Sequence, residues 1–202
     1  MKSPTYEVLR DGERRSSSDR LTVDDRRLRG RAITFNSLSK VIMHPRIGPF
    51  REQILSDAVN RTLKGVADVK ALWDHDTREV LGSRKAGTLI LTKNLRGLDI
   101  EIDPPRWAAK YVETVERGDV DGMSFKFFVP DQSGESWDFG SRDGIPVRSV
   151  KDMIFNEITI TPFPAYDDTS VEVSQRSIEL FLEQHRPAYN WRARYHEIVH
   201  EE

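Results

Sequence analysis

Apolar and polar residues alternate along much of the chain with a period of two, which predicts a protein built mainly from short β-strands. The alternation is clearest in residues 31–36, 87–93, 97–103, 123–129 and 154–160, and residues 66–75 have an extended pattern as well. Residues 107–116 repeat their apolar residues every four positions and predict an amphipathic helix, and residues 57–63 and 178–184 predict two more. These elements predict a mainly β protein with helices, an α+β fold, whose mostly antiparallel strands form a barrel or a sandwich.

The two ends of the chain lack this periodicity. Residues 1–25 include three consecutive serines, Ser16 to Ser18, and predict a flexible N-terminal arm. Arginines crowd among acidic residues from Arg10 to Arg31; we interpret this stretch as solvated, and an arm that binds an acidic partner is the alternative. We therefore expect one domain over residues 26–175, followed by a C-terminal helix and tail over residues 176–202.

The composition narrows the class of protein. A chain of 202 residues is long enough for one domain with a substantial core, and its net charge of -2 gives no overall field toward nucleic acid. No apolar run approaches the roughly 20 residues that span a bilayer, and the N-terminus has no signal-peptide pattern, so we expect no membrane association. The lack of cysteine excludes thiol catalysis, disulfides and thiolate metal sites, and it fits a reducing cytoplasm.

Ser124 is the first candidate for chemistry. The period of two places four large apolar residues on one face of a strand, which makes that face the core: Met123, Phe125, Phe127 and Val129. Ser124 then lies on the opposite face beside the small Gly122, and we expect it to be rigid yet accessible, as a nucleophile requires. A surface serine without a function is the other interpretation. The segment differs from a hydrolase nucleophile elbow, because Lys126 stands where that motif has its second glycine.

His75 and Glu157 are two further polar residues in strand-like segments. His75 ends an apolar stripe that runs through Ala71 and Trp73, and histidine suits proton transfer because it titrates near neutral pH. Glu157 shares the polar face of its strand with two threonines. If it lies near His75, its carboxylate could accept the imidazole N–H, fix the tautomer and stabilise the imidazolium. A core histidine and a solvated carboxylate are the alternative interpretations.

Several short motifs follow one another along the chain. They are Phe50-Arg51-Glu52, His75-Asp76, Leu81-Gly82, Gly87-Thr88-Leu89, Gly97-Leu98, Gly118-Asp119-Val120, Gly122-Met123-Ser124-Phe125, Glu157-Ile158-Thr159-Ile160 and Pro164-Ala165. In this order and spacing they resemble the prohead protease family of tailed bacteriophages, over roughly residues 27–175. No single motif is specific, and the resemblance depends on their number and order.

The resemblance implies a serine endopeptidase with Ser124 as nucleophile, His75 as general base and Glu157 as third member of a triad. It also implies a fold similar to the herpesvirus maturation protease, an antiparallel β-barrel flanked by helices. The implied substrates are the scaffold segment of the phage major capsid protein and the chain's own tails, cleaved inside the assembling procapsid in the host bacterial cytoplasm. The portal protein and a homo-oligomer are further candidate partners. No metal, organic cofactor, nucleic acid or membrane is implied.

One departure from the family concerns Lys126, because the family often has a small residue two positions after the serine. Positions i and i+2 of a strand lie about 7 Å apart on one face. Lys126 could therefore crowd the site, donate to an acyl oxyanion or replace His75 as the base. The two tails are candidates for capsid docking or self-cleavage, which exposed termini permit.

Two alternatives concern other classes of protein. Residues 196–200 fit the zinc-protease pattern His-Glu-x-x-His, but only two glutamates follow and no third ligand is available downstream, so we expect a chance match. The other alternative is a non-enzymatic capsid-assembly or scaffold protein that retains the barrel. The presence of all three polar residues at the family's positions argues against it.

Overall fold

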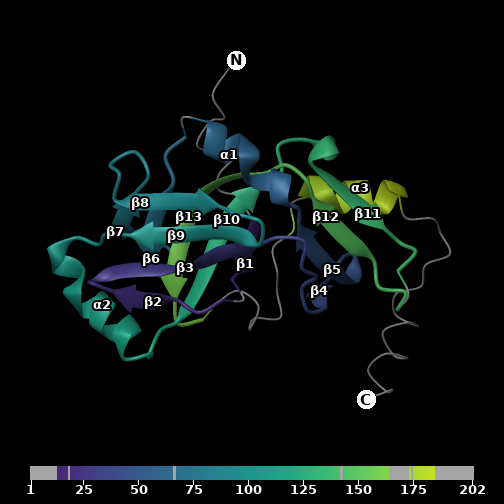
Figure 1. Ribbon diagram of the computed structural model, residues 1–202. Helices are drawn as coiled ribbons and strands as arrows, with labels where there is room; N and C mark the ends of the chain where they lie inside the picture. The colour runs from purple at the N-terminus through teal and green to yellow at the C-terminus, as the bar shows by residue number, and fades with distance from the viewer. Residues whose placement is uncertain are drawn as a thin grey trace.

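The structure, a computed structural model, describes residues 13–17, 19–65, 67–141, 143–163, 173 and 175–184. Within these residues the chain forms three β-sheets and three α-helices (Figure 1). No helix in this part of the chain is both long and apolar enough to cross a membrane.

A five-stranded sheet contains the strand with Ser124. In spatial order its strands are β1 (Glu13–Ser16), β10 (Gly122–Phe128), β13 (Ile154–Thr161), β6 (Lys70–Trp73) and β7 (Asp76–Ser83). Neighbouring strands are antiparallel except β13 and β6, which are parallel. Met123 and Phe125 on β10 pair with Ile160 and Ile158 on β13, and all four are buried. The period of two therefore sets the core face of this sheet as predicted.

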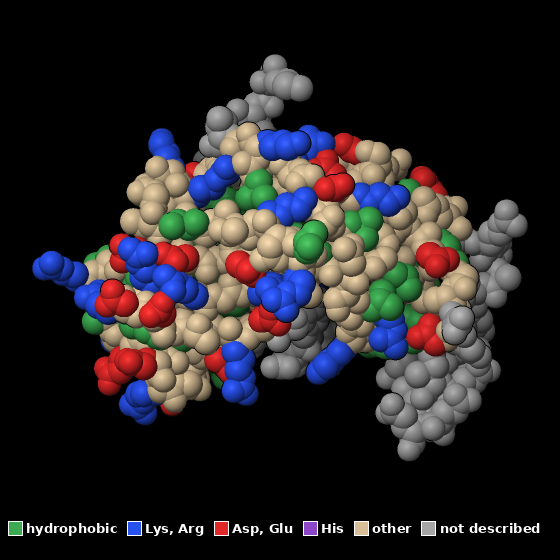
Figure 2. Space-filling model, viewed as in Figure 1, with side chains coloured by type: hydrophobic (Ala, Val, Ile, Leu, Met, Phe, Trp, Pro, Cys, Tyr) green, Lys and Arg blue, Asp and Glu red, His purple; other side chains and the backbone are tan. Residues whose placement is uncertain are grey.

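A four-stranded sheet, called the front sheet below, packs against that core face. It consists of β2 (Thr22–Asp24), β3 (Arg27–Thr34), β9 (Gly97–Ile102) and β8 (Leu89–Lys93), and it lies in front of the five-stranded sheet in Figure 1. Leu28 and Ile102 belong to the same buried cluster as Met123 and Phe125. On the outer face, Arg29 donates to Glu101 at 2.8 Å. Lysine and arginine accordingly intermix with acidic side chains on this side of the molecule (Figure 2).

The third sheet forms a second, smaller core with the last helix. Its strands are β11 (Glu135–Asp138), β12 (Val147–Val150), β5 (Gly48–Ile54) and β4 (Ile42–His44), and β12 and β5 are parallel. Helix α3 (Gln175–Gln184) lies beside β11 and β12 in Figure 1. Trp137 packs edge-on against Phe50 and Phe181, with ring centroids 5.3 and 4.9 Å apart. This contact ties α3 to the sheet.

A buried cluster of charged side chains joins the third sheet to β1. Its five members are at most 4% exposed: Glu13, Arg15, Glu52, Glu135 and Arg148. Arg15 donates from Nε to Glu52 at 2.6 Å, and Arg148 donates to Glu52 at 2.9 Å. Arg148 also donates to the hydroxyl of Ser177 on α3 at 2.9 Å. The cluster therefore connects strands of two sheets and one helix.

The three predicted helices are confirmed. A 3-10 turn, Ser56–Val59, leads into α1 (Asn60–Lys64), and a second, Arg106–Ala108, leads into α2 (Ala109–Glu116). A third short 3-10 turn, Gln132–Gly134, precedes β11. Tyr111 of α2 stacks on Trp73 of β6 with ring centroids 4.2 Å apart. Helix α2 is thus fixed next to the end of β6.

The fold class is confirmed as mainly β with helices, but the barrel is not. The described strands form three separate sheets that do not close into a barrel, and two strand pairs are parallel. The N-terminal region also differs from the expected arm: β1 and β2 lie within residues 1–25, and Arg15 is fully buried. Sequence patterning missed β1 because its inward residues, Glu13 and Arg15, are charged.

Replacing Gly97 with alanine is expected to destabilise the front sheet. A Cβ at this position would lie 2.2 Å from the carbonyl oxygen of Ile33, which is backbone and cannot move aside easily. We expect Gly97→Ala to lower the free energy of unfolding by about 1–3 kcal/mol, measured by urea denaturation. The control is Gly140→Ala, where the nearest atom is a side-chain oxygen of Asp138 at 3.3 Å. Equal stability of the two variants would contradict the prediction.

Candidate active site

Ser124 lies on the face of β10 opposite the core residues, as the alternation predicts, but it is not accessible. Its exposed fraction is 1%, and its hydroxyl has no hydrogen-bond partner among the residues that the structure describes. The expectation of a reachable serine is therefore wrong for this conformation. Strand β10 is an inner strand of its sheet, and Ser124 is the direct partner of Ser16 of β1 on one side and of Thr159 of β13 on the other.

His75 lies in a turn and not on a strand, which corrects the extended segment predicted to end there. Trp73 and Asp76 pair directly, so Asp74 and His75 form a two-residue hairpin connection between β6 and β7. Both residues have left-handed backbone, with φ of 48° and 59°. Such turns require positive φ at both central positions, and Asp and His tolerate it better than most residues. His75 therefore does not continue the apolar stripe of β6 as a strand residue.

The imidazole of His75 meets the carboxylate of Glu157. Its Nδ1–H donates to Oε1 of Glu157, and the two side chains are 18% and 14% exposed. An ionised carboxylate only accepts hydrogen bonds, so the proton of a neutral imidazole is on Nδ1 and the lone pair is on Nε2. This is the tautomer that a general base needs.

Two threonines of β13 contact the same turn. The hydroxyl of Thr159 accepts from the backbone N–H of His75 at 2.9 Å and donates to the carbonyl of Leu72 at 3.2 Å. The hydroxyl of Thr161 donates to the carboxylate of Asp74 at 2.8 Å. Sequence patterning placed both threonines on the face of Glu157 but gave them no role. The sequence feature that could have indicated a role is the repeat Glu157-x-Thr159-x-Thr161, in which every side chain on this face of the strand is polar.

The strand register brings Ser124 to the same place. Ser124 and Thr159 are direct partners of an antiparallel pair, so their Cα atoms are about 4.5–5.5 Å apart and their side chains lie on one face. The hydroxyl of Thr159 in turn accepts a hydrogen bond from the backbone N–H of His75. The three predicted residues therefore gather around one residue of β13, although the hydroxyl of Ser124 forms no hydrogen bond with the imidazole here.

The charged residues near His75 and Ser124 have different partners. Asp76 is bound to Arg78, whose guanidinium and backbone N–H lower the pKa of Asp76 to about 2. Among the carboxylates adjoining the turn, the one that bonds the imidazole is therefore Glu157. Lys126, two positions after the serine, is the direct partner of Glu157 across β10 and β13. Its side chain is thus placed on the face where the three predicted residues lie.

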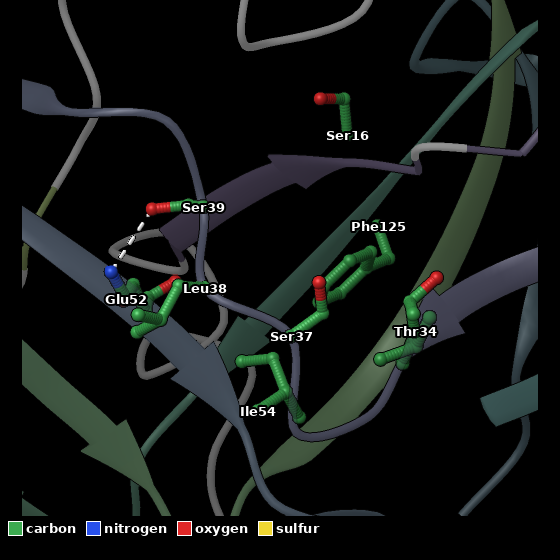
Figure 3. A pocket seen from close by; sticks show the side chains of 9 residues that line it. Ser16, Thr34, Ser37, Leu38, Ser39, Glu52, Ile54 and Phe125 are labelled. Carbon is green, nitrogen blue, oxygen red and sulfur yellow. Dashed lines mark hydrogen bonds between the residues drawn. The ribbon is translucent and has the colours of Figure 1, made fainter. Parts of the chain in front are cut away.

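A small pocket lies near β10 but does not hold these residues (Figure 3). Its volume is about 80 Å³, and its lining includes Ser16, Leu38, Ile54 and Phe125. Phe125 belongs to the core face of β10, whereas Ser124 and His75 are not part of the lining. In the described ranges no three His, Asp or Glu side chains cluster as metal ligands. Residues 196–200 lie outside those ranges, as do residues 164–165 of the family motif.

Comparison with known proteins identifies the family. No curated protein and no solved structure gives a significant match to the chain. A family model described as caudovirus prohead serine protease matches residues 13–184. The match begins at β1 and ends at the last residue of α3, so it spans all three sheets and includes His75, Ser124 and Glu157. The chain belongs to the caudovirus prohead serine protease family.

Proposed function

We propose that this chain is an endopeptidase in which Ser124 is the nucleophile, His75 the general base and Glu157 the residue that orients His75. The hydrogen bond from Nδ1 of His75 to Glu157 carries the proposal. It leaves Nε2 as the acceptor for a serine proton, and the register places Ser124 one strand from Glu157 on the same face.

The residues suggest an ordinary two-step acyl transfer. The Ser124 oxygen attacks the scissile carbonyl carbon while Nε2 of His75 takes the hydroxyl proton, and Glu157 stabilises the imidazolium that forms. The imidazolium then protonates the leaving amine as the peptide C–N bond breaks. A water molecule, deprotonated by His75, hydrolyses the acyl-serine and restores the enzyme.

The buried hydroxyl sets a condition on this mechanism. Ser124 is 1% exposed and makes no hydrogen bond within the described ranges, so a substrate carbonyl reaches it only after a local rearrangement. Catalytic hydrogen bonds are often long or misaligned in free enzymes and tighten when substrate binds. We therefore assign the described conformation to a closed state of the proposed enzyme.

The proposed substrates are the scaffold segment of the phage major capsid protein and the protein's own tails. The family supports contact with phage capsid proteins and action within the procapsid. Inside a closed shell the effective concentration of substrate is very high, so a modest intrinsic rate is sufficient. The portal protein and a second copy of the chain are further candidate partners.

A non-enzymatic assembly protein with the same fold is the second candidate function. The isolated hydroxyl of Ser124 favours it, because a buried serine without a hydrogen bond to the histidine is not activated. The paired His75 and Glu157 favour the enzyme. The following experiment distinguishes the two functions.

Incubation with a fluorophosphonate probe is expected to modify one residue, Ser124, since only an activated serine reacts at an appreciable rate. The measurement is intact mass followed by peptide mapping, with and without a metal chelator. We expect one adduct, located on the peptide that contains Ser124, and no effect of the chelator. An unmodified protein would support the assembly role, and an adduct that forms only in the absence of the chelator would contradict a metal-independent serine site.

A further inference from the structure

We propose that Thr159 is a positioning residue for the general base, whose hydroxyl holds the His75 turn in register with Ser124. This inference rests on the proposed function of the site and deepens it. Thr159 touches neither the scissile bond nor the imidazole ring; it acts through the backbone of His75.

Three alternate residues of β13 hold three different parts of the turn. Glu157 accepts from the ring of His75, Thr159 accepts from its backbone N–H, and Thr161 donates to the carboxylate of Asp74. The backbone of the same strand contributes one more bond, from the amide of Asp74 to the carbonyl of Ile160 at 2.8 Å. Strand β13 is therefore a template for the turn, and Thr159 is its middle contact.

The turn needs such support because its backbone is costly. Neither Asp74 nor His75 is glycine, yet both have positive φ. Residues held in this region persist when the surrounding structure over-determines them. The hydroxyl of Thr159 is well suited to this, because it is buried, accepts from the His75 amide and donates to Leu72, the penultimate residue of β6. It thus links the turn and its strand to β13.

Thr159 also fixes the distance between base and nucleophile. It is the direct partner of Ser124 in the β10–β13 pair and the acceptor for His75. Any shift of the turn relative to β13 moves the imidazole relative to the serine by a similar amount. A displacement of about 1 Å in reacting groups can lower a rate by about 10²-fold.

The test compares Thr159→Val, which keeps the shape but removes the hydroxyl, with Thr159→Ser, which keeps the hydroxyl. The matched control is Thr62→Val on α1: Thr62 is also buried, accepts from the amide of Phe155 at 3.1 Å and donates to the carbonyl of Met153 at 3.4 Å. The same chemical change is thereby made at the start of β13, where the hydroxyl bonds the amide of Phe155 and not that of His75. Each variant is measured for hydrogen exchange at the His75 amide and for the rate of fluorophosphonate modification.

We expect Thr159→Val to accelerate exchange at the His75 amide by at least about 10-fold and to slow modification of Ser124 by about 10²-fold. Thr159→Ser is expected to restore both values, and Thr62→Val to change neither, although both valine variants lose urea resistance. Unchanged exchange in Thr159→Val, failure of the serine variant to rescue, or equal loss of modification in Thr62→Val would each overturn the inference.

Failure of the proposed function has a different signature. If wild-type Ser124 is not modified at all, the protease assignment fails, whereas the exchange data still decide whether Thr159 holds the turn. If wild-type Ser124 is modified and Thr159→Val behaves like wild type, the enzyme stands and the positioning role does not.

Discussion

Replacing Ser124 with alanine is expected to abolish trimming of the phage major capsid protein when the two proteins are co-expressed. Loss of the nucleophile of a serine protease lowers kcat on the order of 10⁶-fold, which leaves no cleavage visible on a gel. The substitution itself is structurally mild, because the hydroxyl it removes makes no hydrogen bond in the described part of the chain. The measurement is the intact mass of the capsid subunit and of the protease after assembly.

The matched control for this experiment is Ser16→Ala. Ser16 is the direct partner of Ser124 on β1 and is likewise buried, so the two substitutions make the same chemical change on neighbouring strands of one sheet. We expect Ser16→Ala to trim capsid subunits as wild type does. Equal trimming by Ser124→Ala and wild type would refute the enzyme and leave the assembly role.

The largest expected effect on stability comes from Arg148. Although burial opposes it, the carboxylates of Glu13, Glu52 and Glu135 hold the pKa of the Arg148 guanidinium well above its usual value. Arg148→Met keeps the apolar stem but leaves these three buried carboxylates with Arg15 as the only remaining cation of the cluster. Breaking a buried ion pair in this way costs about 3–5 kcal/mol, so we expect a loss of this size in urea denaturation.

Arg29→Met is the control for charge alone. Arg29 also pairs with two carboxylates, those of Asp24 and Glu101, but it is 43% exposed on the outer face of the front sheet. Exposed pairs contribute roughly 0–1 kcal/mol. If both methionine variants lose the same stability, burial does not determine the cost and the cluster is not what holds β1 to the third sheet.

The sequence predicts those parts of the fold that follow a repeating pattern. The alternation through Met123, Phe125 and Phe127 identified both the strand and its buried face, and the helix periods located all three helices. It could not predict β1, because Glu13 and Arg15 are buried by partners as distant as Arg148, and no local pattern marks such pairing. The division into three sheets likewise depends on long-range pairing.

The candidate site shows the same division. The residue types at positions 75, 124 and 157 were evident from the sequence, and the polar face of residues 157–161 was visible as an alternation. The turn at His75 was missed because the apolar stripe continued to that position, whereas positive φ at Asp74 depends on how β6 and β7 pair. The position of β10 as an inner strand was missed because its neighbour, β1, was interpreted as a flexible arm.

The position of β10 between β1 and β13 has a consequence for protein synthesis. A ribosome that has just added Ser124 has already added His75 but not Glu157 or Thr159. Glu13 likewise still lacks its partner Arg148, which lies 135 positions later in the chain. A nascent chain therefore contains the proposed nucleophile and base without the strand that aligns them. We expect proteolytic competence to arise only after nearly the whole polypeptide has emerged, so that translation itself delays the first cut.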